Sequence, residues 1–165
     1  MDKFVIQIDT REQEGKNIHL LDYFHKQGIK TVRSKCVVGD YINMFDQTIA
    51  VDRKQNIIEL INNVTQDHER FRRELMLAQE LGVKLVVLVE EYFANVYALK
   101  YWKSKIWKYG PKKGQPVSQM KGETLMKILL TMQNKYGVEF RFCRKEETAP
   151  LIVKILKKEE GEINA

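Results

Sequence analysis

The sequence has little cysteine: Cys36 and Cys143 are the only two, they are far apart, and neither belongs to a CxxC pair or has a histidine nearby. This arrangement argues against a zinc site. We interpret both as free, buried thiols in a reducing compartment. The three histidines share no ligand spacing either, and we interpret them as surface or helix-cap residues: His19, His25 and His68.

Long apolar runs are absent as well. No segment approaches the length of a membrane span, and residues 1–4 hold no signal-peptide core, so we expect a cytosolic protein without membrane contact. Hydrophobic residues make up 44% and charged residues 30% of the chain, which is typical of a folded globular protein. The net charge of +6 permits an anionic partner such as nucleic acid but does not require one.

Apolar periodicity predicts strands that alternate with helices. Strands are expected at residues 4–9, 30–38, 48–52, 84–90 and 138–142. Helices are expected from Asn17 to Gly28, from Asn56 onward, over 67–81, up to Gly137, and over 146–158 with Pro150 in the first turn. Their apolar faces comprise Ile18, Leu21 and Phe24; Ile57, Leu60 and Ile61; Phe71, Leu75, Ala78 and Leu81; and Leu125, Leu129, Met132 and Tyr136. This order predicts one α/β domain over residues 1–165, with a sheet covered on both faces.

Two acidic motifs carry the strongest chemical signal. Gly39-Asp40-Tyr41 is followed by Asp52-Arg53-Lys54, with the two aspartates twelve positions apart. If residues 37–41 and 48–54 form adjacent strands, both carboxylates converge on one point, and carboxylate oxygens bind hard divalent cations. Such a cation neutralises a scissile phosphate and lowers the pKa of a bound water. Lys54 shares a strand face with the second aspartate, so it can orient the attacking water or assist its deprotonation.

Taken alone, this spacing is not specific. Acid-x-Lys triplets occur by chance in charged chains, and the alternative is a solvated strand end. Three features favour the catalytic interpretation. The triplet directly follows an apolar strand, Asp40 lies in a glycine turn, and Asp9 ends the first strand, from which it can reach the same edge of the sheet.

Five short motifs then occur in an informative order. They are Asp9-Thr10-Arg11-Glu12, Gly39-Asp40-Tyr41, Asp52-Arg53-Lys54, Arg70-Phe71 and Leu88-Val89-Glu90. In this order the chain resembles the nuclease domain of the XPF/Hef/Mus-type structure-specific DNA endonucleases, over residues 4–158 with 93–117 unmatched. It departs from the family pattern at Asp52, where a glutamate is usual, and at Ile58, where an aspartate is frequent and Glu59 stands next to it.

The resemblance implies a restriction-endonuclease-like fold, in which helices flank a mixed central sheet. It also implies cleavage of DNA that depends on Mg²⁺ or Mn²⁺. By position in the motifs, Asp40 and Asp52 would be the principal metal ligands, and Asp9 would be a further ligand or a supporting acid. Lys54 would act on the water.

Four more residues acquire roles from the resemblance. Arg11, Glu12 and Arg53 would support the site or contact phosphate. Arg70 would lie on the neighbouring helix and face the site or the DNA. The alternatives are a surface ion pair between Arg11 and Glu12, which stabilises little, and a solvated helix face around Arg70.

Residues 100–117 interleave lysines with aromatic residues, glycines and prolines. We interpret them as part of an inserted loop over 93–117, with at most a short helical turn. Lysines neutralise phosphates and aromatic rings stack on unpaired bases, so the loop supplies three candidate DNA contacts: Lys103, Lys105 and Lys108. The alternative is a mobile solvated loop whose Trp102 and Trp107 pack against the body.

Substrate and partners stay open at this level. We expect branched DNA, as flaps, forks or junctions in repair or recombination, against plain duplex or Holliday junctions. The retained acids and lysine argue against a catalytically silent DNA-binding subunit. A homodimer could form through the C-terminal helices, or the same residues could be core: Leu125, Leu129, Met132, Leu151, Ile152, Ile155 and Leu156. The expected location is the cytoplasm of a bacterium or phage-infected host, or the nucleus of a eukaryote.

Overall fold

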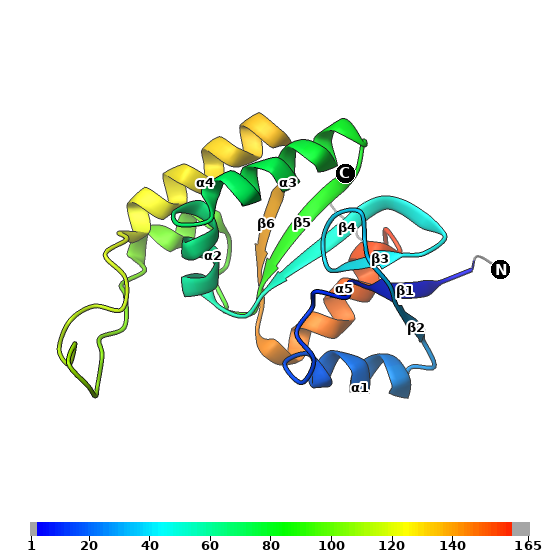
Figure 1. Ribbon diagram of the computed structural model, residues 1–165, viewed down its shortest axis with the longest axis horizontal. Helices are drawn as coiled ribbons and strands as arrows, with labels where there is room; N and C mark the ends of the chain where they lie inside the picture. The colour runs from blue at the N-terminus through cyan, green and yellow to red at the C-terminus, as the bar shows by residue number, and fades with distance from the viewer. Residues whose placement is uncertain (1–2, 160–165) are drawn as a thin grey trace.

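Six strands form one mixed sheet through the part of the chain that the structure describes, residues 3–159 (Figure 1). The structure is a computed structural model. Residues 1–2 and 160–165, the two ends of the expected 1–165 domain, lie outside the described residues. The strands are β1 (Val5–Ile8), β2 (Lys30–Arg33), β3 (Tyr41–Asn43), β4 (Asp46–Lys54), β5 (Lys84–Val89) and β6 (Glu139–Phe142).

The sheet has an antiparallel centre between two parallel parts. Its strand order is β2-β1-β3-β4-β5-β6. β1 runs parallel to β2 and antiparallel to β3, and β3 runs antiparallel to β4. β4, β5 and β6 are parallel, so their connections cross over the sheet as helices. The predicted mixed α/β sheet with flanking helices is confirmed.

Helices cover both faces of the sheet (Figure 1). On one face lie α1 (Ile18–Lys26) and α5 (Thr148–Leu156). On the other lie α2 (Ile57–Val64), α3 (His68–Glu80) and α4 (Gly122–Tyr136). Two short 3₁₀ helices are η1 (Val96–Tyr101) and η2 (Lys145–Glu147). No helix within the described residues has both the length and the apolar character needed to cross a bilayer.

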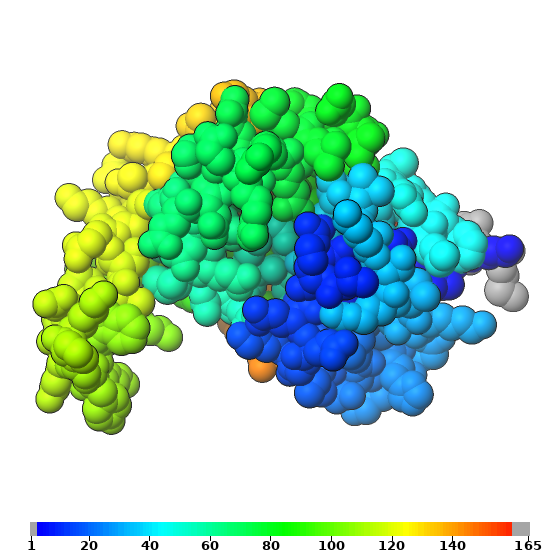
Figure 2. All heavy atoms as spheres, in the orientation of Figure 1, coloured from blue at the N-terminus to red at the C-terminus, as the bar shows by residue number. Residues whose placement is uncertain are grey.

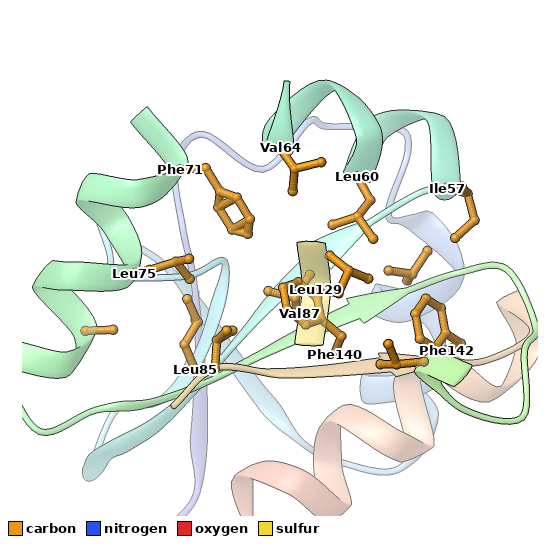
Figure 3. Packing of buried hydrophobic residues seen from close by; sticks show 14 of the residues in the cluster. Ile57, Leu60, Val64, Phe71, Leu75, Leu85, Val87, Leu129, Phe140 and Phe142 are labelled. Carbon is orange, nitrogen blue, oxygen red and sulfur yellow. The ribbon is translucent and has the colours of Figure 1, made fainter. Parts of the chain in front are cut away.

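The apolar strand β5 divides the core into two clusters. Its side chains alternate between faces, so Leu85 and Val87 pack under α2, α3 and α4, whereas Val86 and Leu88 pack against α1 and α5. Figure 3 shows the first cluster, in which Leu85 and Val87 lie among side chains from the helices and from β6. The expected burial of this strand on both faces is therefore confirmed. Burial of each side chain of this size contributes about 1.5–3 kcal/mol to stability.

Two helical faces differ from the predicted ones. In α1, Leu20 and Phe24 are buried, whereas Ile18 and Leu21 are exposed. The helix therefore turns a narrow i, i+4 stripe toward the sheet rather than the broader predicted face. In α3 the predicted face is correct except for Leu81, which lies beyond the last helical residue and is exposed.

The segment between β2 and β3 is not a strand as predicted. β2 ends at Arg33, and residues 37–40 are irregular, so the predicted strands 30–38 and 37–41 are both too long. Gly39 has a φ of +72°, in the left-handed region, which an extended strand cannot accommodate. Regular pairing with β4 begins only at Tyr41.

Most of the apolar residues named on the C-terminal helices belong to the core, as the alternative interpretation expected. Five of the seven proposed dimer residues are buried, so the interface interpretation is wrong for Leu125, Leu129, Ile152, Ile155 and Leu156. The other two, Met132 and Leu151, are partly buried against the same clusters. Both cysteines are free and buried, as expected. Pro150 lies in the first turn of α5, where its missing N–H costs nothing.

Candidate active site

The turn at Gly39 and Asp40 brings the first acid against β4. A Cβ at Gly39 would lie 3.0 Å from the carbonyl oxygen of Val51, so the close approach, like the positive φ, requires glycine. Asp40 donates its main-chain N–H to that same oxygen at 2.8 Å. The carbonyl of Asp40 accepts the N–H of Asp9 at 2.8 Å. The turn therefore joins the end of β1 to β4 at the aspartate.

Asp40 and Asp52 are neighbours in the register of β3 and β4. Tyr41 lies opposite Val51 in the β3–β4 pair, so the antiparallel register places Asp40 opposite Asp52. The main-chain N–H of Arg53 donates to Asp40 Oδ2 at 2.8 Å, which turns the carboxylate toward β4. The structure thus brings together the two acids that the motifs singled out.

The charge of Asp52 acts on the neighbouring Asp40 carboxyl. Burial, and then the charge of Asp52, raise the pKa of Asp40 well above its usual value. Asp52 is buried, and its Oδ2 has no hydrogen-bond donor within the described residues, although Lys54 Nζ lies 3.1 Å away. A buried carboxylate oxygen without a donor is costly. The Lys54 ammonium therefore supplies the positive charge beside this oxygen, and the two adjacent acids retain oxygens that can bind a further cation.

Lys54 lies on the same face of β4 as Asp52, as strand alternation predicts. Its ammonium is 3.1 Å from Asp52 Oδ2 and 5.8 Å from the centre of the Phe71 ring. Burial alone would lower the pKa of Lys54, but attraction by Asp52 and Asp40 outweighs burial and raises it. An ammonium has donors and no acceptor, so it can stabilise negative charge but cannot ligate a metal.

A third acid, Glu74, reaches the site from α3, and the sequence motifs did not single it out. Glu74 Oε1 accepts the N–H of Gly39 at 3.0 Å. Burial, and then the charge of Asp52, raise the pKa of Glu74. The available signal was an acid at the inward edge of an amphipathic helix, three residues after the buried Phe71. Across the described part of the chain, no three or more His, Cys, Asp or Glu side chains form a metal-binding group.

Asp9 accepts three hydrogen bonds, which engage both of its carboxylate oxygens. Its Oδ1 accepts the N–H of Cys36 at 2.7 Å, and its Oδ2 accepts the N–H of Arg11 at 3.1 Å and the Nε of Arg11 at 2.7 Å. Burial alone would raise the pKa of Asp9, but these hydrogen bonds outweigh burial and lower it. The geometry favours the supporting role of Asp9 over direct ligation. It also holds Arg11, whose side chain is 66% exposed, at the rim of the site.

Arg53 points to the opposite face of β4 and lies at the centre of a buried ion-pair network. Its Nη2 and Nε donate to the carboxylate of Glu12 at 2.8 and 3.2 Å, and its Nη1 donates to Glu90. All three side chains are nearly inaccessible to solvent. The alternative of a surface ion pair between Arg11 and Glu12 is wrong, because each of these residues has a different partner.

Glu90 extends this network to two helices. Its Oε2 lies 2.7 Å from His19 Nε2 and accepts the hydroxyl hydrogen of Thr148 at 2.9 Å. His19 is therefore not the plain surface or cap residue that we predicted, since it ties α1 to the end of β5. Glu90 belongs to one of the five motifs but had received no role. The signal for it was a charged residue directly after an apolar run of five residues, 85–89.

Two other motif residues lie beside the site. Arg70 is exposed on α3, one helical turn before Glu74 and on the same side of the helix. Glu59, next to the Ile58 position where the family often has an acid, helps to raise the pKa of Lys54. Its carboxylate also accepts the N–H of Gln55 at 2.7 Å, which closes the first turn of α2.

The three candidate DNA-binding lysines lie apart from this cluster. Lys103, Lys105 and Lys108 are exposed on the segment that follows η1. Trp102 packs against the core, as the solvated-loop alternative expected. Trp107 does not, because it is 42% exposed.

Comparison with known proteins agrees with this arrangement. The ERCC4 domain model matches residues 8–155, which include every residue of the acidic cluster and of the Arg53 network. The chain belongs to the ERCC4 domain family. The XPF-type nuclease domain that the motifs indicated is thereby confirmed.

Two solved structures share the fold of this ERCC4-family chain. XPF from Aeropyrum pernix is 14% identical, with a TM-score of 0.63 over 96% of this chain and 68% of that one. The same protein in complex with DNA is 15% identical, with a TM-score of 0.64 over 97% of this chain and 66% of that one. The chain thus spans about two thirds of these proteins. A search of curated proteins found no match to its sequence.

Proposed function

We propose that this ERCC4-family chain is a divalent-metal-dependent endonuclease that hydrolyses phosphodiester bonds in DNA. The convergence of Asp40, Asp52 and Lys54 at one end of β4 carries the proposal. Hydrolysis of a phosphodiester needs anionic anchors for a cation and a positive donor near the attacking water. The fold shared with an XPF that has been solved in complex with DNA supports DNA as the partner.

Asp40 and Asp52 fit a cation such as Mg²⁺ or Mn²⁺. Their carboxylates lie against each other, and buried Asp52 has the Lys54 ammonium 3.1 Å from its Oδ2 as its ion-pair partner. Mg²⁺ commonly binds through one or two carboxylates and completes its shell with water and substrate phosphate, so a two-acid site suffices. When bound, the ion would neutralise the scissile phosphate and lower the pKa of water. Asp9 and Glu74 would hold the turn that carries Asp40.

The other residues act on position and charge. Lys54 would direct its N–H donors at the attacking water or at the charge of the transition state. Arg53 binds Glu12 and Glu90 on one face of β4. These ion pairs would hold the end of the strand so that Asp52 and Lys54 stay on the opposite face. Arg11 at the rim, held by its bonds to an acid, would contact a phosphate of the substrate.

Branched DNA is the substrate that we propose, as flaps, forks or junctions in repair or recombination. Membership of the ERCC4 domain family supports this choice. Two rivals remain to be separated from this function. One is a nuclease of plain duplex or of Holliday junctions, and the other is a catalytically silent DNA-binding subunit. A single assay distinguishes them.

That assay incubates the full chain with labelled duplex, flap, fork and four-way-junction DNAs in Mg²⁺, Mn²⁺ or EDTA. We expect cleavage of branched substrates with either metal and no cleavage in EDTA. Equal cleavage of plain duplex would contradict the branch preference, and cleavage of four-way junctions alone would narrow the substrate to that structure. Binding without cleavage in every metal would overturn the enzyme proposal in favour of the silent subunit.

A further inference from the structure

The basic excess of the chain is confined to one segment. Residues 92–122 contain seven lysines and no acidic residue, whereas the remainder of the chain has 21 basic and 22 acidic residues. Every one of these lysines is exposed: Lys100, Lys103, Lys105, Lys108, Lys112, Lys113 and Lys121. A molecule that is otherwise nearly neutral therefore presents a single strongly positive projection, which favours an anionic partner at this place.

The same segment exposes aromatic rings. Tyr97, Tyr101 and Tyr109 are 60%, 76% and 85% exposed, and Trp107 is 42% exposed. Large apolar side chains that gather on a surface usually mark a binding site. Rings spaced among lysines are the combination that single-stranded nucleic acid requires, because every base has a face that stacks and every phosphate has a charge.

Residues 103–120, which we call the arm, form an irregular hairpin. Ile106 pairs with Pro116 as an isolated antiparallel bridge. The Trp107 N–H donates to the carbonyl of Gln115 at 2.9 Å, and the Trp107 carbonyl accepts the N–H of Gly114 at 2.8 Å. These bonds join the two legs of the arm and leave its lysines and the ring of Tyr109 directed away from the core.

The base of the arm is anchored. Trp102 and Met120, at its two ends, pack against the core cluster under α4. A Cβ at Gly122 would lie 2.1 Å from the carbonyl oxygen of Leu99, so the first residue of α4, directly after the arm, crosses η1 in close backbone contact. An anchored arm presents its side chains with less ordering entropy to lose on binding than a free loop would.

The arm starts at the same end of the sheet as the acidic cluster. β4 and β5 are parallel, so the chain leaves β5 next to the end of β4, and the Glu90 N–H donates to the carbonyl of Lys54 at 2.8 Å. Glu91 then accepts the N–H of Ile57 at 3.1 Å. In Figure 2 the arm, in yellow-green, projects at the lower left, and a hollow separates it from the blue N-terminal part of the body.

We propose that the arm binds an unpaired nucleic-acid strand, with Trp107 and Tyr109 stacking on bases and the arm lysines contacting phosphates. We infer this ligand from two features of the arm. Its lysines complement the phosphate charges of a nucleic acid, and its exposed rings can stack on unpaired bases. The inference rests on the proposed function in two respects: the nucleic acid is DNA, and the unpaired DNA strand runs from the acidic cluster toward the arm. It adds a binding site to that function, outside the catalytic residues.

The test measures binding without cleavage. Fluorescence anisotropy in EDTA compares the full chain with a Trp107→Ala/Tyr109→Ala variant, on a labelled oligothymidylate and on a matched duplex. Each stacking ring lost should weaken strand binding about tenfold, and duplex binding should stay nearly unchanged. Phe45→Ala is the matched control, because Phe45 is an exposed ring in the turn before β4, at the opposite end of that strand from Lys54. Circular dichroism verifies folding, and Tyr109→Ala alone tests the most exposed ring if the double variant unfolds.

Each other outcome is decisive. Unchanged strand binding, or an equal loss on strand and duplex, overturns the proposal. Loss of a dimer in sedimentation, with unchanged affinity for the oligonucleotide, would overturn it in favour of a contact between two copies of the chain. Loss of strand binding by a chain that cleaves no DNA in any metal supports the arm and refutes the proposed nuclease. Unaltered strand binding by a chain that cleaves DNA refutes the arm alone.

Discussion

The end of β4 and the arm carry positive charge in opposite ways. At the end of β4, Arg53 and Lys54 are buried, and each has carboxylate partners supplied by the fold. On the arm, the lysines are exposed and no acidic residue stands within the segment. A buried charge is stable only with a partner, whereas an exposed charge is solvated by water and stays available to a ligand. The same residue type therefore organises structure in one region and attracts an anion in the other.

Of these variants, removal of Arg53 should lower the free energy of unfolding the most. A small loss would contradict the contrast between buried and exposed charges. Arg53→Ala removes the guanidinium that Glu12 and Glu90 share, and loss of one partner of a buried pair costs about 3–5 kcal/mol. Urea unfolding measures the free energy. The control is Arg72→Ala, since Arg72 lies 3.8 Å from Glu69 on the surface and its loss should cost under about 1 kcal/mol. Similar losses for the two variants would show that the network contributes no more than a surface pair.

Neutralisation of Asp40 should separate activity from stability. We expect Asp40→Asn to lower cleavage about a thousandfold, because a direct ligand of the cation is lost. The free energy of unfolding should not fall, since the change relieves the repulsion between Asp40 and Asp52. Cleavage rates and urea unfolding are compared with those of Asp22→Asn, an exposed acid on α1. Wild-type turnover by Asp40→Asn would rule out this site.

Removal of Lys54 should affect the chemical step and spare metal binding. Lys54→Ala should lower kcat about a hundredfold with a smaller change in KM, because the ammonium acts on charge that develops in the transition state. Single-turnover cleavage and calorimetry with Mn²⁺ are measured on the same samples. Lys35→Ala serves as the control, since Lys35 is exposed and outside the motif. If Lys54→Ala cleaves as fast as the parent, the assignment of the acid-x-Lys motif is wrong.

Neutralisation of the arm should have the smallest effect and one that depends on salt. Changing three exposed lysines to alanine should weaken DNA binding about tenfold at low salt and much less at high salt, because fewer counterions are released on binding. The altered residues are Lys103, Lys105 and Lys108. A control variant changes three exposed lysines elsewhere: Lys26, Lys30 and Lys154. Anisotropy titrations over a salt series give the slope, and an identical slope for both variants would remove the arm from the DNA interface.

Much of the fold could be predicted from local patterns. The apolar run of β5, the Asn56 cap of α2 and the left-handed Gly137 after α4 each depend on neighbouring residues, and the structure has all three. The predicted strand 37–41 was wrong because close approach to Val51 determines the conformation of Gly39. The acids Glu74 and Glu90 were not found as site residues because their partners lie tens of positions away in the sequence.

The sequence by itself determined which side chains of the triplet share a face. Strand alternation places Asp52 and Lys54 together and turns Arg53 away, whatever the rest of the fold does. Only the tertiary structure decided what each face meets. The order of strands brings Asp40 opposite Asp52, and the segments that follow β1 and β5 bring Glu12 and Glu90 to Arg53. Local chemistry thus sets the direction of a side chain, but burial and partner charge, which set its function, come from segments far apart in the chain.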